Sequence, residues 1–184
     1  MLEFIKRNDL QIEVWKIPGE VDLPDNDSNA RYDAAAQQIQ PLANIFNDLG
    51  CTFGLYNHGG WGGLPTTMVE IARRLENVGI VYNFHHGHEH LPSMSEDLAA
   101  MLPHLLCVNL NGMAANGPQI LPLADGEDDA SILRLVAESG YKGPIGILDH
   151  RPETDAEESL KQNLAGMQKL LRQLDAPHVL SSYL

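Results

Sequence analysis

The sequence is poor in several residue types, and each scarcity excludes a class of protein. It contains only two cysteines, Cys51 and Cys107, which are too few to make a disulfide framework or a zinc site by themselves. No apolar run reaches the roughly 18 residues that a membrane-spanning helix needs, so we expect no membrane partner. Residues Met1–Leu10 lack the basic-then-apolar order of a signal peptide, which favours a cytoplasmic protein.

Basic residues are scarce as well. The 12 Lys and Arg are scattered among 25 Asp and Glu, and the formal net charge is −13. Binding to a nucleic-acid backbone relies on clustered positive charge, so nucleic acid is not an expected partner. Hydrophobic residues make up 43% of the sequence and charged residues 20%, as in ordinary soluble globular proteins. The 184 residues suffice for one substantial core, so we predict a single domain over residues 1–184.

Short apolar or β-branched runs alternate along the chain with stretches of helical spacing. Apolar residues recur every three or four positions in 34–49, 68–75, 132–136 and 160–174, which predicts helices there. Gly50 and Gly140 stand where two of these helices should end. Alternating strands and helices imply parallel strands, in either a doubly wound sheet or a barrel. The apolar runs predict strands over Gln11–Ile17, Thr52–Tyr56, Val78–Phe84, Leu105–Leu110 and Ile145–Leu148.

Polar or titratable residues stand at or just after the carboxyl end of every predicted strand. In parallel α/β folds ligands bind where the strands reach their carboxyl ends, so these residues form a candidate binding site. Histidine suits proton transfer or the binding of hydroxyl groups near neutral pH. The candidates in chain order are Lys16, Tyr56, Asn57, His58, Asn83, His85, His86, Asn109, Asn111, Asp149, His150 and Arg151.

Two further segments belong to this candidate edge. The glycine loop 59–63 follows the second strand and carries Trp61, whose ring can stack on a sugar. It matches neither the phosphate-binding loop nor the dinucleotide fingerprint. In the histidine-rich stretch 85–90, His88 and His90 are expected on a loop, where adventitious binding of transition metals explains them best.

The strand-end segments also resemble a known family. Sugar phosphate isomerase/epimerase-like proteins with a xylose-isomerase-type TIM barrel are similar to this chain over nearly its whole length. The resemblance implies a partial (β/α)8 barrel of about five βα units, corresponding to strands 4–8, with Met1–Asp9 as the end of the preceding helix. The segments that carry it are GLYNHGGW (Gly54–Trp61), NVGIVYNFHHGH (Asn77–His88), HLLCVNLNGM (His104–Met113), ILPL (Ile120–Leu123) and GYKGPIGILDHR (Gly140–Arg151).

The resemblance further implies a divalent metal, Mn²⁺ or Mg²⁺, bound by Glu, Asp, His and Glu at the last four strand ends. At the first position this chain has Tyr56 or Asn57. Asn83 and Asn109 stand at the next two positions, and only Asp149 keeps a carboxylate. Neutral amides hold hard cations less strongly than carboxylates do, so the metal ligands stay unassigned. His86 matches the histidine that follows the sixth strand in these families.

Three functions follow from these observations. The first is a sugar or sugar phosphate isomerase or epimerase with His58, His86 and Asp149 as acid–base or polarising groups and the other strand-end residues, with Trp61, as substrate contacts. The second is a non-catalytic carbohydrate-binding relative, and the third a metal-dependent phosphodiesterase.

A complete barrel needs roughly 250 residues. We therefore expect a piece of a longer protein, a homo-oligomer formed through open sheet edges, or an open sheet.

Overall fold

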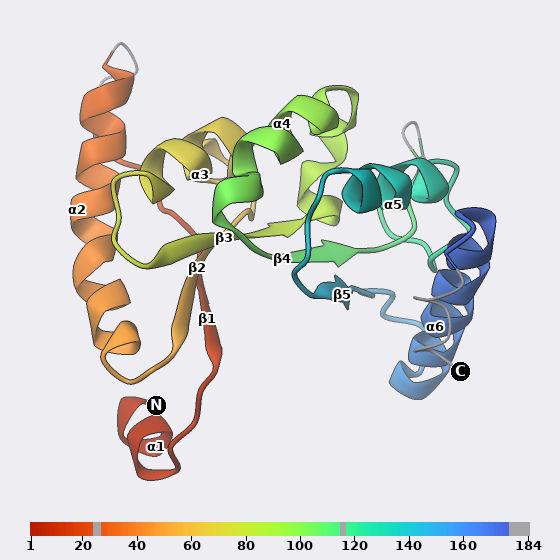
Figure 1. Cartoon of the computed structure of the whole chain (residues 1–184), viewed down its shortest axis with the longest axis horizontal. Helices are drawn as coiled ribbons and strands as arrows, with labels where there is room; N and C mark the ends of the chain where they lie inside the picture. Colours follow the sequence, from red (N-terminus) through yellow and green to blue (C-terminus); the bar gives the residue numbers. More distant parts are fainter. Residues whose placement is uncertain (24–26, 115–116, 177–184) are drawn as a thin grey trace. The chain divides into compact units, whose positions relative to one another are not determined.

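The computed structural model describes residues 1–23, 27–114 and 117–176. Five strands form one sheet in chain order (Figure 1). β1–β2, β2–β3 and β4–β5 pair in parallel, which confirms the predicted α/β class and partial barrel. Every predicted strand is present, with small shifts at the ends: β1 Glu13–Lys16, β2 Thr52–Tyr56, β3 Val78–Asn83, β4 Leu105–Leu110 and β5 Ile145–Ile147.

Helices separate the strands, as their spacing predicts. No helix is predicted over α4, although Met94, Leu98 and Met101 recur there at helical spacing and are buried. The histidine-rich stretch forms a 3-10 helix instead of the expected loop. None of the described helices is both long and apolar enough to cross a membrane. The α-helices are α1 Leu2–Arg7, α2 Ser28–Asn47, α3 Pro65–Ala72, α4 Met94–Met101, α5 Asp129–Glu138 and α6 Ala156–Gln173, and the 3-10 helices are η1 Trp61–Gly63, η2 Phe84–Ser93 and η3 Leu102–His104.

Contacts divide the chain into two compact units. The first unit contains residues 1–82 and 96–107, and the second contains 83–95 and the chain from Val108 onward. The sheet includes strands from both units, so the predicted single domain stays a prediction.

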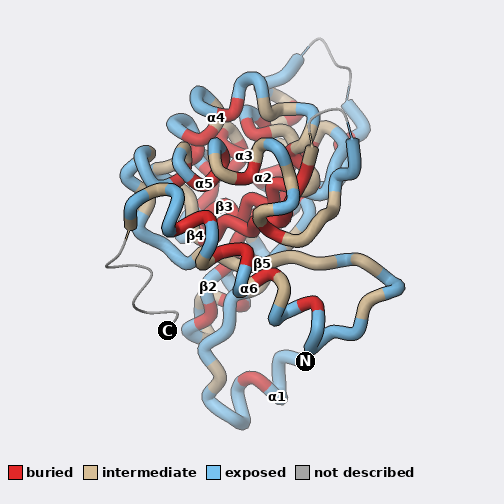
Figure 2. Tube along the Cα trace, turned by 90° about the vertical axis from the view of Figure 1, so that its right-hand side faces the viewer, coloured by how far each residue is buried: buried red, intermediate tan, exposed pale blue. Residues whose placement is uncertain are grey.

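The core of the first unit lies between its strands and helices. Phe46 of α2 stacks on Phe53 of β2 with ring centroids 6.0 Å apart, so α2 runs alongside that strand (Figure 1). Every residue of β3 is buried (Figure 2), as a strand inside a parallel sheet should be. In the second unit the apolar faces of α5 and α6 contribute Ile132, Met167 and Leu170 to the core.

Two glycines end helical segments in the predicted way. Gly50 and Gly140 have φ angles of 76° and 85°, in the left-handed region that favours glycine. Gly50 lies two residues before β2, and Gly140 lies two residues after α5 ends, so both follow the last turn of a helix.

The close approach of strands at Gly79 gives a test of the first core. A Cβ at this position would lie 2.3 Å from Cγ of Leu106 and 2.7 Å from the carbonyl oxygen of His104. We expect Gly79→Ala to lower the free energy of unfolding by about 1–3 kcal/mol, measured by urea denaturation. Gly19→Ala is the matched control, because nothing lies within 4 Å of the added Cβ. Equal stability of the two variants would contradict the packing described here.

Candidate functional site

The first unit places one group of candidate residues after β1 and β2. Tyr56 ends β2, its ring stacks on Trp15 at 5.3 Å, and the ring of His58 lies 6.1 Å from it. Asn57, between the two, is buried. Lys16 ends β1 and donates through Nζ to the carbonyl of Ile17 at 2.7 Å, so its ammonium is engaged by the backbone.

Trp61 has close neighbours that the sequence does not predict. The guanidinium of Arg31 lies 4.3 Å from the centroid of the indole, and Tyr32 stacks on it at 5.7 Å. The carboxylate of Glu20 accepts a hydrogen bond from the backbone N–H of Trp61 at 3.2 Å and pairs with Arg31 at 3.5 Å. These contacts fix the indole against α2, so stacking on a sugar would have to use the part of the ring they leave open.

The second unit brings three histidines together. The rings of His85 and His86 lie 4.6 Å apart, and the ring of His150 meets His85 edge-on at 5.7 Å. Asn83, the last residue of β3, accepts a hydrogen bond from the backbone N–H of His85 at 3.2 Å and thereby caps η2. The strand-end positions predicted for these histidines therefore converge, although His150 follows a different strand.

Two further amides, Asn109 and Asn111, come from the end of β4. Asn111 follows β4 directly, is only 2% exposed, and donates through Nδ2 to the carbonyls of Gly112 at 2.8 Å and Gln119 at 2.6 Å. Its Oδ1 is buried and has no hydrogen-bond partner among the described residues. Asn109 lies against Gly146 of β5, where an added Cβ would approach its Oδ1 to 2.1 Å.

Asp149 is held by donors from three residues. Arg151 contacts both carboxylate oxygens through Nε at 3.0 Å and Oδ2 through Nη2 at 2.7 Å, while Asn163 of α6 donates to Oδ2 at 2.8 Å. The hydroxyl of Ser159 donates to the same oxygen. The Arg151 guanidinium, with the help of these neutral donors, holds the pKa of the Asp149 carboxyl well below its ordinary value. Ser159 and Asn163 are site neighbours that helical spacing alone does not reveal.

The metal implied by the family does not fit these residues. A divalent cation prefers several carboxylate oxygens, yet the one carboxylate at the implied positions, Asp149, is already neutralised by Arg151. The Oδ1 of Asn83 is engaged by His85. Within residues 1–23, 27–114 and 117–176, no three His, Cys, Asp or Glu side chains are arranged to hold a metal ion.

The contacts of His88 also differ from expectation. Its Nε2 lies 2.8 Å from the carbonyl oxygen of Ala114, so this histidine ties η2 to the segment after β4. This contact gives His88 a structural role, and the adventitious metal binding suggested by the sequence stays a prediction.

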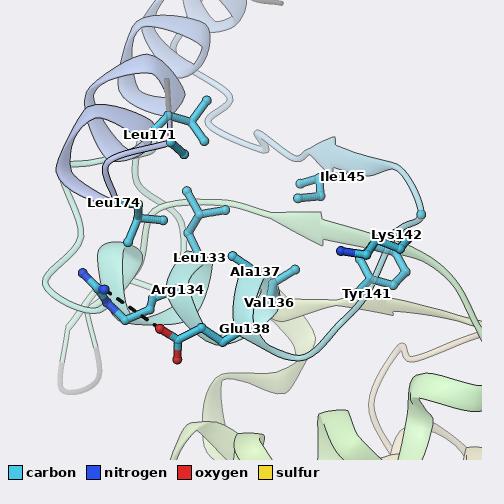
Figure 3. A pocket seen from close by; sticks show the side chains of 12 residues that line it. Leu133, Arg134, Val136, Ala137, Glu138, Tyr141, Lys142, Ile145, Leu171 and Leu174 are labelled. Carbon is cyan, nitrogen blue, oxygen red and sulfur yellow. Dashed lines mark ion pairs between the residues drawn. The ribbon is translucent and has the colours of Figure 1, made fainter. Parts of the chain in front are cut away.

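A pocket of about 500 Å³ lies away from the strand ends. Leu133 and Val136 of α5, Ile145 at the start of β5, and Leu171 of α6 line it (Figure 3). Its wall is largely aliphatic and lacks the convergent amides and imidazoles that bind hydroxyl groups. We therefore place the candidate site at the carboxyl ends of the strands.

Parallel strands with covering helices define this protein as a barrel-type α/β protein, and polar groups at the strand ends agree with that class. A family model described as xylose isomerase-like TIM barrel matches residues 8–170. The chain belongs to this family.

Solved structures with the same fold include sugar epimerases. A D-tagatose 3-epimerase-like protein is 19% identical, over 95% of this chain and 67% of its own, with a TM-score of 0.69. L-ribulose 3-epimerase is 14% identical, over 98% and 70%, with a TM-score of 0.69. A xylose isomerase-like TIM barrel protein from Mycobacterium smegmatis, in complex with magnesium, is 19% identical, over 99% and 65%, with a TM-score of 0.63.

At such low identities these likenesses establish the fold alone. The chain spans about two thirds of the length of each of these proteins. No curated protein matches the sequence.

The ion pair at Asp149 predicts a specific dependence of stability on pH. The pKa of the Asp149 carboxyl is lower in the folded chain than in the unfolded chain. The stabilisation from the ion pair is therefore complete above the unfolded pKa, and it is lost as the pH falls from that value toward the folded pKa. We expect Asp149→Asn to lower the free energy of unfolding by about 1–3 kcal/mol at pH 7. The difference from wild type should shrink below about pH 4, where the unfolded carboxyl binds its proton.

The measurement is urea denaturation across this pH range. Glu153→Gln, at an exposed position, is the control and should change stability by no more than about 0.5 kcal/mol. A constant difference between wild type and Asp149→Asn at every pH would contradict the assignment.

Proposed function

We propose that this protein is a sugar isomerase or epimerase that moves a proton between adjacent carbons of a small free sugar without a tightly held metal. The observation that carries the proposal is the group His85, His86 and His150, which lies beside amides at the strand ends of the second unit. Imidazoles exchange protons near neutral pH, and amides donate to and accept from hydroxyl groups. Membership of a family whose solved relatives include sugar epimerases supports the same reaction class.

An uncharged sugar fits the described cations better than a sugar phosphate does. Arg151 is paired with Asp149, and Lys16 donates to a backbone carbonyl. A phosphate group would require these residues to give up their partners, and the net charge of −13 would repel it further. Hydroxyl groups need only the hydrogen-bonding side chains at the strand ends.

In this proposal the residues have separate tasks. His86, at the position of the family histidine, donates to the sugar oxygen that gains negative charge during proton transfer. Asp149 acts as the anchor of Arg151, since its carboxylate is saturated with donors. His58 and Tyr56 form a second polar group in the first unit, and His58→Ala tests whether that group takes part.

A carbohydrate-binding relative without catalysis is the second candidate. The amides at the positions of the family carboxylates favour it, because binding needs hydrogen bonds but no charged metal site. A phosphodiesterase receives no such support, since its metal would need the same absent carboxylates.

Exchange of carbon-bound hydrogen separates catalysis from binding. In heavy water the wild-type chain should incorporate deuterium next to the carbonyl of at least one of D-tagatose, D-psicose and L-ribulose, followed by NMR. We expect His86→Ala to reduce the exchange rate by about 10²–10⁴-fold with an unchanged melting temperature.

The control is His90→Ala, which removes another histidine of η2 and should leave the rate unchanged. Full activity of His86→Ala would exclude its role, and sugar binding without any exchange would favour the non-catalytic relative.

Thermal melting tests whether sugar binding is independent of a metal ion. A ligand that binds only the folded state raises the melting temperature by mass action. We expect one of these sugars at millimolar concentration to raise it in the presence of EDTA, with no further rise when Mn²⁺ replaces the chelator. A shift that requires Mn²⁺ would contradict the metal-free site.

A further inference from the structure

One backbone carbonyl in the second unit receives two side chains of the candidate site. The oxygen of Gln119 lies 2.6 Å from Nδ2 of Asn111 and 3.4 Å from Nδ1 of His85. A carbonyl oxygen has two acceptor positions and no proton, so both neighbouring nitrogens must be donors. Asn111, the Gln119 carbonyl and His85 therefore form a short hydrogen-bonded chain.

This chain fixes the tautomer of His85. Because Nδ1 faces an acceptor, it carries the ring proton of the neutral imidazole, and Nε2 is then the basic nitrogen. In the same way, a group that accepts from one ring nitrogen orients the histidine of many acid–base sites.

Asn111 holds the carbonyl in place. Its Nδ2 donates to two carbonyls, so the amide has only one satisfactory orientation, with Oδ1 turned away from both. The side chain is 2% exposed, and its Oδ1 has no hydrogen-bond partner within the described chain. A buried acceptor without a donor is destabilising, which indicates that this amide serves more than local stability.

We propose that His85 is the base of the proton transfer and that Asn111 is a positioning residue that acts on it through the carbonyl of Gln119. The proposal rests on the proposed sugar chemistry and assigns its base. His86, with its ring 4.6 Å from His85, then serves as the neighbouring donor to the sugar oxygen.

The proposed step balances without a metal or an outside reactant. Nε2 of His85 takes a proton from the carbon beside the sugar carbonyl, and the C–H electron pair forms the C=C bond of an enediolate. The imidazolium returns this proton to the adjacent carbon, and one hydroxyl proton moves between the two oxygens. His85 ends as the same neutral tautomer with which it began.

His88 supplies an internal reference for the test. Its Nε2 faces the carbonyl of Ala114 at 2.8 Å, so by the same argument Nε2 carries the proton in this ring. Two histidines three positions apart are thus expected in opposite tautomeric forms, set by two different backbone carbonyls.

The experiment is long-range ¹H–¹⁵N NMR of the histidine rings in the full 184-residue chain, at a pH where they are neutral. We expect His85 as the Nδ1–H form and His88 as the Nε2–H form. In Asn111→Leu, which keeps the branched side-chain shape but removes the donor, His85 should become a mixture of the two tautomers while His88 stays unchanged. With an exchanging sugar, kcat should fall by about 10–100-fold at unchanged KM.

An Nε2–H form of His85 in the wild type would overturn the proposal, and this spectrum needs no variant to fold. An unchanged His85 tautomer in Asn111→Leu would overturn the role of Asn111. The expected tautomers with no exchange of any sugar would overturn the catalytic assignment together with the proposed function, whereas the wrong tautomer with clear exchange would overturn only the assignment of the base.

Discussion

Parallel strand pairing is the constraint on which the rest of this structure depends. Because neighbouring strands run in the same direction, their carboxyl ends meet at one edge, and residues that follow different strands become neighbours. In the second unit, Leu110 pairs with Ile147, so the chain leaves both strands at the same level, with Asn111 one residue and Asp149 two residues beyond this pair. The convergence of His85 and His150, which are far apart in sequence, is a product of the same geometry.

The polar groups at this edge are held by partners deeper in the fold. Asp149 is tied to α6 through Asn163, whose Oδ1 also accepts from the backbone N–H of Leu123 at 2.9 Å. Asp129 at the start of α5 accepts from three backbone N–H groups, while burial raises the pKa of its carboxyl. These two carboxylates therefore hold backbone and side-chain donors of the surrounding loops and of α6 in place.

Much of the fold follows from local patterns in the sequence. The five strands are short apolar runs, and Gly50 and Gly140 end helices because only a left-handed residue fits there. The strand-end residues could also be named in advance, since they depend only on where each strand stops. Their partners could not: Trp61 meets Arg31, and Asp149 meets Asn163, through tertiary contacts that periodicity does not encode. Nor does the sequence show that Arg151 neutralises Asp149, because charge pairing depends on side-chain geometry.

The distribution of tryptophan between the two units has an optical consequence. Both tryptophans of the sequence, Trp15 and Trp61, lie in the first unit. Trp15 is 45% exposed, whereas Trp61 lies beneath the guanidinium of Arg31. Tryptophan fluorescence of this protein consequently reports on one unit only, from one solvent-exposed indole and one covered by a guanidinium. If only the unit with the three clustered histidines melted, tryptophan fluorescence would not change. Backbone circular dichroism or tyrosine absorbance would be needed to detect that transition.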